Sequence, residues 1–365
     1  MRLLFSLATF TCCISLQAQT QRVEVVEYHP APGQFVNILP EGDASASHEE
    51  MCRRCEEQME DGNMVHLGAY GGYMTVKFDH PVQNKRGSDF RIVGNGLYNI
   101  DYPLGGTFEP GIVYVGVGDD VKTCKWYELA GSEYYTREVH DFSITYRKPT
   151  AESGEHQQLH STYDNYIGWS CKWTDGNGTQ RDSTGYHMKL DYHQQNYWPQ
   201  WENKDELTFY GGRLPNNAKD ESGKGSLWIL YRYAEDAYGY ADASLATDPY
   251  STFDLDWAVD DNGNAVSLDH CDFIRVMTGV FQHCGWIGET STEVASFTDL
   301  HLTDGYDDNP VIITPRKPTG IRRTPTLLPG ETARFNIQGK RLAKPEPGLN
   351  IIHMSDGSVK KIMVK

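Results

Sequence analysis

Short runs in which apolar and polar residues alternate constrain the fold of this chain more than any other sequence feature. Segments 74–78 and 142–147 read Met-Thr-Val-Lys-Phe and Phe-Ser-Ile-Thr-Tyr-Arg. Side chains on a β-strand point to opposite faces in turn, so each segment predicts a half-buried strand. Gly111–Val117 is almost entirely apolar, which indicates a strand buried between two layers.

The clearest alternation places Phe253, Leu255, Trp257 and Val259 on one face of a predicted strand. The pair Asn262-Gly263 follows, as in a two-residue hairpin, and 273–278 is the next predicted strand. Elsewhere, Ser47 precedes Glu50 by three residues and a charged run reaches Glu60 before Gly62, which predicts one short helix.

These patterns predict an all-β protein. With 35 Gly and 22 Tyr in 365 residues, turns and aromatic residues are frequent, as in β-sandwiches. The expected architecture is a β-sandwich or jelly-roll-like body with one short N-terminal helix. No repeat of fixed period is present, which disfavours a propeller or a solenoid.

The N-terminus has the pattern of an export signal. Arg2 precedes an apolar stretch, Leu3–Leu16, that is too short to span a bilayer, and the small residue Ala18 follows. We therefore predict a signal peptide at residues 1–18 and an exported protein at the cell surface, in the outer membrane or secreted. A lipid attached at Cys12 or Cys13 is the alternative.

Export would leave six cysteines in a compartment where disulfides persist, so some could pair. Cys52 and Cys55 have the spacing of a metal or redox site, but a zinc site would need a second ligand pair. The favoured interpretation is two cysteines at the surface or bridged to each other.

Charge divides the chain in two. Residues 316–365 contain eleven basic and three acidic residues, whereas the preceding part, without Arg2, has a net charge of −26. We predict a body at 19–312, a proline-rich linker at 313–328 and a small basic β-module at 329–365. So negative a body repels phosphate backbones, which argues against nucleic acid as a partner.

Nine aromatic residues lie between Tyr163 and Trp201, among polar neighbours. Aromatic rings in such a setting suit stacking on a planar or sugar-like ligand; the alternative is that they fasten long loops to the sandwich. A further tryptophan lies between two glycines, which implies a bent backbone that presents its ring. The predicted ligand-binding residues are Trp169, Trp173, Tyr197, Trp198, Trp201 and Trp286.

Asp254 and Asp256 would project from the same face of the predicted strand. Like charges so placed suit a Ca²⁺ site or a catalytic pair, and a solvated strand face is the alternative. No other cofactor is predicted. The sequence has no Gly-x-Ser-x-Gly elbow, no His-Glu-x-x-His and no phosphate-binding glycine loop.

Six blocks between residues 22 and 303 together resemble a family of exported cell-surface proteins of Bacteroidetes. Members are often found with TonB-dependent transporters of the outer membrane, and some resemble surface binders of corrinoids such as vitamin B12. The resemblance implies ligand capture without catalysis. The segment 348–365 is similar to C-terminal sorting modules of the same bacteria. The six blocks are Gly71–Pro81, Ser88–Asn95, Glu109–Val113, Trp126–Ser132, Phe253–Asp260 and Gly285–Glu293.

We therefore expect a non-catalytic surface protein that captures a corrinoid or a glycan for an outer-membrane uptake system, with a TonB-dependent transporter as a possible partner. A secreted glycoside hydrolase or lyase with a carboxylate pair is the first alternative. A structural adhesin without a small ligand is the second.

Overall fold

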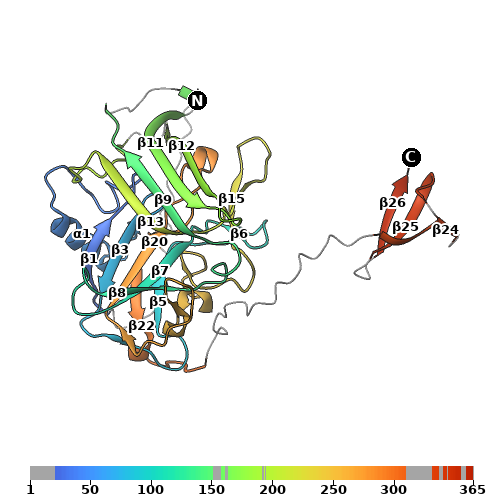
Figure 1. Cartoon of the computed structure of the whole chain (residues 1–365). Coiled ribbons are helices and arrows are strands. Elements are labelled where there is room, and N and C mark those ends of the chain that lie inside the picture. The colour runs from blue at the N-terminus through green and yellow to red at the C-terminus, as the bar shows by residue number, and fades with distance from the viewer. Residues whose placement is uncertain are drawn as a thin grey trace. The chain divides into compact units, whose positions relative to one another are not determined.

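Figure 1 shows the computed structural model of the chain, which describes residues 21–150, 158–160, 163–190, 193, 195–309, 331–336, 340–342, 344–354 and 359–364. The predicted signal peptide, 1–18, and the predicted linker, 313–328, lie outside these residues. The chain divides into two compact units, Met1–Lys317 and Pro318–Lys365, and each is described by itself.

The larger unit is a sandwich-like all-β structure, as predicted. Its main sheet has seven strands, and every pair in it is antiparallel. β7, between β20 and β8, is the predicted continuous apolar run, and Val113 and Val115 are fully buried there. In spatial order the strands are β1 (Glu24–His29), β3 (Tyr73–Lys77), β20 (Phe273–Thr278), β7 (Gly111–Val117), β8 (Lys125–Leu129) and β18 (Ala258–Val259), with β16 (Tyr240–Ala241) also paired to β7.

A second, five-stranded antiparallel sheet lies next to it (Figure 1). Phe142, Ile144 and Tyr146 on β9 are buried, while the residues between them are more exposed. This confirms the predicted alternation and supplies one side of a second core. The strands are β10 (Gln158–His160), β11 (Tyr163–Thr174), β9 (Val139–Arg147), β13 (Glu206–Arg213) and β12 (Gln180–Leu190), the last paired to β11.

Four small sheets complete the body. They are β14 (Ala218–Asp220), β15 (Trp228–Tyr231) and β6 (Gly105–Gly106); β17 (Thr252–Phe253), β5 (Phe90–Val93) and β22 (Ser296–Asp299); β19 (His270–Cys271) with β4 (Val82–Gln83); and β2 (Val65–His66) with β21 (Glu293–Val294). Single 3₁₀ turns are η1 (Pro249–Ser251), η2 (Leu255–Trp257), η3 (Gly285–Ile287) and η4 (Leu300–Leu302).

The predicted helix is α1 (His48–Glu60). It begins where Ser47 Oγ accepts a hydrogen bond from the Glu50 amide at 3.1 Å, which satisfies one free donor of the first turn. Cys52 and Cys55 face the core from this helix, and burial raises the pKa of the Cys52 thiol to about 12. All six described cysteines are free thiols. The expectation of surface or bridged cysteines is therefore wrong.

The prediction of a continuous strand at 253–259 is also wrong in part. Phe253, Leu255, Trp257 and Val259 are all buried, as predicted. However, the backbone leaves the extended conformation after Asp254, whose carboxylate accepts a hydrogen bond from the Asp256 amide at 2.8 Å and caps η2. A 3₁₀ turn thus produces the burial pattern of a strand.

The turn at Asn262-Gly263 is present, but its return partner differs from the predicted one. Val259 pairs with Ala265 just beyond the turn. The following strand, β20, pairs instead with β3 and β7 at the centre of the main sheet. The hairpin is therefore local.

The smaller unit is an antiparallel sheet in the order β24-β23-β25-β26. Buried Arg334 donates to Asn350 Oδ1 at 3.1 Å, a polar contact inside a thin core. Its strands are β23 (Glu331–Asn336), β24 (Arg341–Leu342), β25 (Gly348–Met354) and β26 (Val359–Val364). In the described part of the chain, no helix has the length and apolar character needed to span a membrane.

Candidate ligand-binding site

Three of the predicted ligand-binding aromatics are core residues. Tyr197, Trp198 and Trp201 have exposed fractions of 0%, 1% and 4%. Trp201 stacks on Tyr28 with ring centroids 5.8 Å apart. The prediction that these three form a ligand face is wrong, and the alternative, that they fasten a loop to the sandwich, describes them.

The loop that carries them is held by one side chain. Asn37 Nδ2 donates to the carbonyls of Asn196 and Trp198, at 2.7 and 2.9 Å, and Asn37 Oδ1 accepts from the Gln200 amide at 2.9 Å. These bonds satisfy backbone carbonyls and an amide of the loop, so its aromatic side chains can enter the core without leaving those backbone groups unpaired.

Trp169 and Trp173, on β11, are half-buried. The Trp169 ring contacts Phe281 edge-on at 4.9 Å, and Trp173 packs on Phe142 at 5.9 Å. Both extend the second core toward the surface.

Trp286 differs from all of these because 46% of its surface is exposed. It is the middle residue of η3, between Gly285 with φ +56° and Gly288 with φ +95°. A side chain at Gly285 would come within 2.5 Å of the Trp228 indole nitrogen. Glycine is needed at both positions, for the left-handed backbone and for the close approach.

Other exposed apolar side chains lie on or beside the small sheet β14-β15-β6, whose β14–β15 turn Trp286 contacts at the Ser226 carbonyl. Five of the nine large exposed apolar residues among those described lie on or beside the small sheet β14-β15-β6. We call them the Trp286 patch. The patch consists of Leu97, Tyr98, Ile100, Leu227 and Trp286, with exposed fractions of 62%, 42%, 98%, 37% and 46%.

Two rings of the patch are held in place. The Trp286 indole N–H donates to the Ser226 carbonyl at 3.3 Å. Arg232 donates to the Tyr98 hydroxyl at 2.6 Å, and the Tyr98 ring meets Phe108 edge-on at 5.0 Å. A ligand that stacks on either ring therefore has little side-chain entropy to remove.

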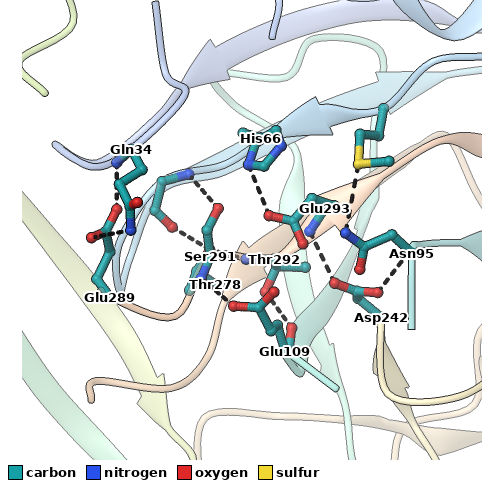
Figure 2. Close-up of polar contacts among 12 residues, drawn as sticks. Gln34, His66, Asn95, Glu109, Asp242, Thr278, Glu289, Ser291, Thr292 and Glu293 are labelled. Carbon is teal, nitrogen blue, oxygen red and sulfur yellow. Dashed lines mark hydrogen bonds and ion pairs between the residues drawn. The ribbon is translucent and has the colours of Figure 1, made fainter. Parts of the chain in front are cut away.

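A row of buried polar contacts anchors the chain that follows Trp286 (Figure 2). Both the backbone and the side-chain amide of Gln34 donate to the Glu289 carboxylate, and the side chain also donates to the Ile287 carbonyl at 2.8 Å. His187 Nε2 lies 3.3 Å from Glu289 Oε2. Burial alone would raise the pKa of Glu289, but His187 and the Gln34 amide outweigh burial and lower it.

The anchoring continues through the next residues. The Ser291 amide donates to Glu109 Oε1 at 3.1 Å, and the Thr292 hydroxyl donates to the Glu109 carbonyl at 2.9 Å. Thr278 Oγ1 accepts from the Thr292 amide at 3.2 Å. The base of the Trp286 loop is thus fixed to Thr278, at the end of β20, and to Glu109, just before β7 (Figure 2).

The row ends in a buried cluster of three carboxylates, Glu109, Asp242 and Glu293, with oxygens within 4.8 Å of one another. His66 Nδ1 lies 2.8 Å from Glu293 Oε1. The Asn95 amide donates to Asp242 Oδ1 at 2.8 Å. Burial, followed by the charge of Glu293, raises the pKa values of Glu109 and Asp242 well above their usual range.

Such a cluster keeps its charge low by retaining protons, or it holds a cation between its oxygens. In either case it fastens β21 and β2 beneath the loop. Sequence reasoning missed these residues. Glu109 and Glu293 fall in blocks that carry the family resemblance, but no local pattern separates them from ordinary surface carboxylates.

The predicted calcium ligands do not share a strand face. Asp254 is 7% exposed and caps η2, while Asp256 accepts from Asn84 Nδ2 at 3.0 Å. Burial raises the pKa of Asp254 to about 6. Within the described chain, neither belongs to a group of three potential ligands. The geometric premise of that prediction is wrong, and a local capping role explains Asp254.

No family model matches the chain, and no curated protein matches it at a significant level. The resemblance to Bacteroidetes surface proteins and to corrinoid binders stays a prediction.

Proposed function

We propose that the protein is a non-catalytic, exported binding protein of the cell surface, which captures a corrinoid or a glycan at the Trp286 patch for an outer-membrane uptake system. The single observation that carries this proposal is the half-exposed Trp286 on a loop with a buried, hydrogen-bonded base. Exposed aromatic surface gains about 25 cal/mol per Å² when a ligand covers it. A fixed base means that little of this gain is lost in ordering the loop.

Both ligand classes suit the patch. A corrinoid has a broad ring with apolar edges and an amide fringe, and a sugar ring has an apolar face that stacks on indole. The body is strongly acidic, which favours neutral or cationic ligands over anionic ones.

Replacing Trp286 with alanine is expected to weaken ligand binding at least tenfold, because the variant loses the stacking surface. Cobalamin binding is measured by equilibrium dialysis, since cobalamin absorbs at the wavelengths of tryptophan emission. Glycan binding is measured by calorimetry. Tyr210→Ala is the matched control, because Tyr210 is an aromatic side chain 74% exposed on β13 and outside the patch; it should bind within twofold of the parent.

Two results would argue against the proposal. If Trp286→Ala retains the parent affinity, the patch is not the site. If neither cobalamin nor any glycan binds a folded parent protein, the structural adhesin becomes the better description.

The hydrolase alternative would need two carboxylates on either side of an accessible cleft, about 5–9.5 Å apart. Glu128 and Glu138 are one pair of neighbouring carboxylates with raised pKa values, and burial raises the pKa of Glu138 to about 8. Their oxygens, however, lie within 4.8 Å of each other, and His140 Nδ1 lies 3.5 Å from Glu138 Oε1 in the same cluster. A pair this close and this covered shares protons and leaves no room for a sugar between the groups.

A further inference from the structure

Two histidines and a glutamate converge on the side of the body where α1 packs on β1. His29 is the last residue of β1, His48 is the first residue of α1, and Glu202 follows the buried Trp201. One ligand atom from each lies within 4.8 Å of the other two. His48 Nε2 is 3.1 Å from Glu202 Oε1, and the two imidazole rings have centroids 5.1 Å apart.

We propose that His29, His48 and Glu202 bind a divalent transition-metal ion, with Zn²⁺ as the best-fitting candidate. Two imidazoles and one carboxylate are a donor set that zinc uses when one coordination position stays open. Bond lengths of about 2.0–2.1 Å around a tetrahedral ion place neighbouring ligand atoms about 3.3 Å apart. The His48–Glu202 separation already has that value to within a few tenths of an ångström.

A pocket of about 350 Å³ opens at the same place. His29 and His48 line it together with Glu27, Glu49 and Cys52. It gives an ion a route to the two histidines and leaves space beside them for water or an external ligand at a fourth position. The carboxylates on its wall favour entry of cations.

The three ligands are placed by rigid elements. Trp201, stacked on Tyr28, fixes the backbone next to Glu202, and the Glu202 amide donates to the Pro199 carbonyl at 3.1 Å. The His29 ring packs against Tyr73 with centroids 5.1 Å apart. The Glu202 side chain is 6% exposed, whereas that of His48 is 49% exposed. The site is thus buried on the glutamate side and open on the His48 side.

The competing explanation is an ordinary His48–Glu202 ion pair with His29 packed beside it. An ion pair needs only one histidine. It does not account for a second imidazole that lines the same pocket and has a ring nitrogen within 4.8 Å of the same carboxylate.

The test uses the exported chain without affinity tag, stripped of metal by a chelator and titrated with Zn²⁺ by calorimetry. Co²⁺ serves as a spectroscopic probe, because its visible absorption is intense only in a tetrahedral site. The parent protein is expected to bind about one equivalent of each ion, and binding should raise its melting temperature. His48→Gln and Glu202→Gln should each weaken Zn²⁺ binding at least tenfold and abolish the intense Co²⁺ band.

His270→Gln is the matched control. His270 is 36% exposed and lies 3.6 Å from the Asp272 carboxylate, so it is a surface histidine with one acidic partner outside the proposed site. Its replacement should leave the titration unchanged. If the parent binds no ion, or if both His48→Gln and Glu202→Gln bind Zn²⁺ as the parent does, the proposal is overturned. Circular dichroism confirms that each variant is folded, and the two ligand variants are independent of each other.

Discussion

Replacing Trp198 with alanine is expected to lower the free energy of unfolding of the body by about 3–5 kcal/mol. The indole is 1% exposed and belongs to the second core, with Phe142, Tyr146 and Phe209. Its removal leaves a cavity that the surrounding β-strands can close only in part. Urea unfolding followed by circular dichroism measures the difference.

Trp286→Ala is the control for this experiment. Because Trp286 is 46% exposed, its loss should change the free energy of unfolding by about 0.5 kcal/mol or less. The two variants thus separate stability from binding. Trp198→Ala should have a much lower free energy of unfolding, whereas Trp286→Ala should keep its stability but lose its ligand. A cost below about 1 kcal/mol for Trp198→Ala would contradict its assignment to the core.

Local patterns predicted the parts of the fold that depend on local chemistry. Ser47 and Glu50 marked the start of α1, because a side-chain cap acts within one turn of the chain. The alternation in β9 marked its buried face, because strand geometry alone decides which side chains point inward. These features need no knowledge of the rest of the molecule.

The aromatic-rich segment could not be read in the same way. Tyr197 and Trp198 have polar neighbours in the sequence, which suggested an exposed loop. They are buried in the second core, which is built from distant segments, and Asn37, far away in the chain, binds the carbonyls around them. These partners are long-range, and no local pattern contains that information.

The candidate sites likewise combine features that local sequence predicts with features that depend on distant segments. Glycines on either side of Trp286 indicated a presented ring, and the ring is exposed. The carboxylates beneath the loop and the histidines beside α1 come from distant segments, so only the folded chain brings them together. The prediction for Asp254 was wrong for a different reason. Asp254 and Asp256 are two residues apart, and this spacing is the same at the start of a 3₁₀ turn as on one face of a strand.

The stability of the body is expected to fall as the pH rises from 6.5 to 8.5. Burial raises the pKa of Glu138 to about 8 from its ordinary value of 4.5. Between these values the folded protein holds a proton that the unfolded chain has released, so raising the pH favours unfolding. Burial also raises the pKa of Asp89, to about 7. Asp89 therefore adds to the loss of stability with rising pH at the lower end of this range.

At lower pH, buried histidines act in the opposite direction, because a lowered histidine pKa makes stability rise with pH. Burial lowers the pKa of His283 to about 4, so the unfolded chain holds more protons at this residue than the folded protein between about pH 4 and 6.5, and stability rises with pH there. From pH 6.5 to 8.5 this contribution fades. The slope then comes from the buried carboxylates, together with the buried thiols, whose pKa values burial raises and which act with the same sign as the pH approaches 8.5. A pKa of about 8 means a loss of about 2 kcal/mol from Glu138 alone between pH 6.5 and 8.

Glu138→Gln tests the origin of this slope. The glutamine still donates a hydrogen bond toward Glu128 but does not titrate, so urea unfolding at pH 6.5, 7.5 and 8.5 should show a slope smaller by up to about 1.4 kcal/mol per pH unit. Glu60→Gln is the control, because the Glu60 side chain is 55% exposed on α1 and pairs with the exposed Arg22. The slope of this variant should equal that of the parent. A parent protein whose stability is flat or rises over this range, or a Glu138→Gln variant with an unchanged slope, would show that the buried carboxylates are ionised at neutral pH. Their charge would then have to be balanced by a bound cation, which removal of metal by a chelator would reveal as a loss of stability.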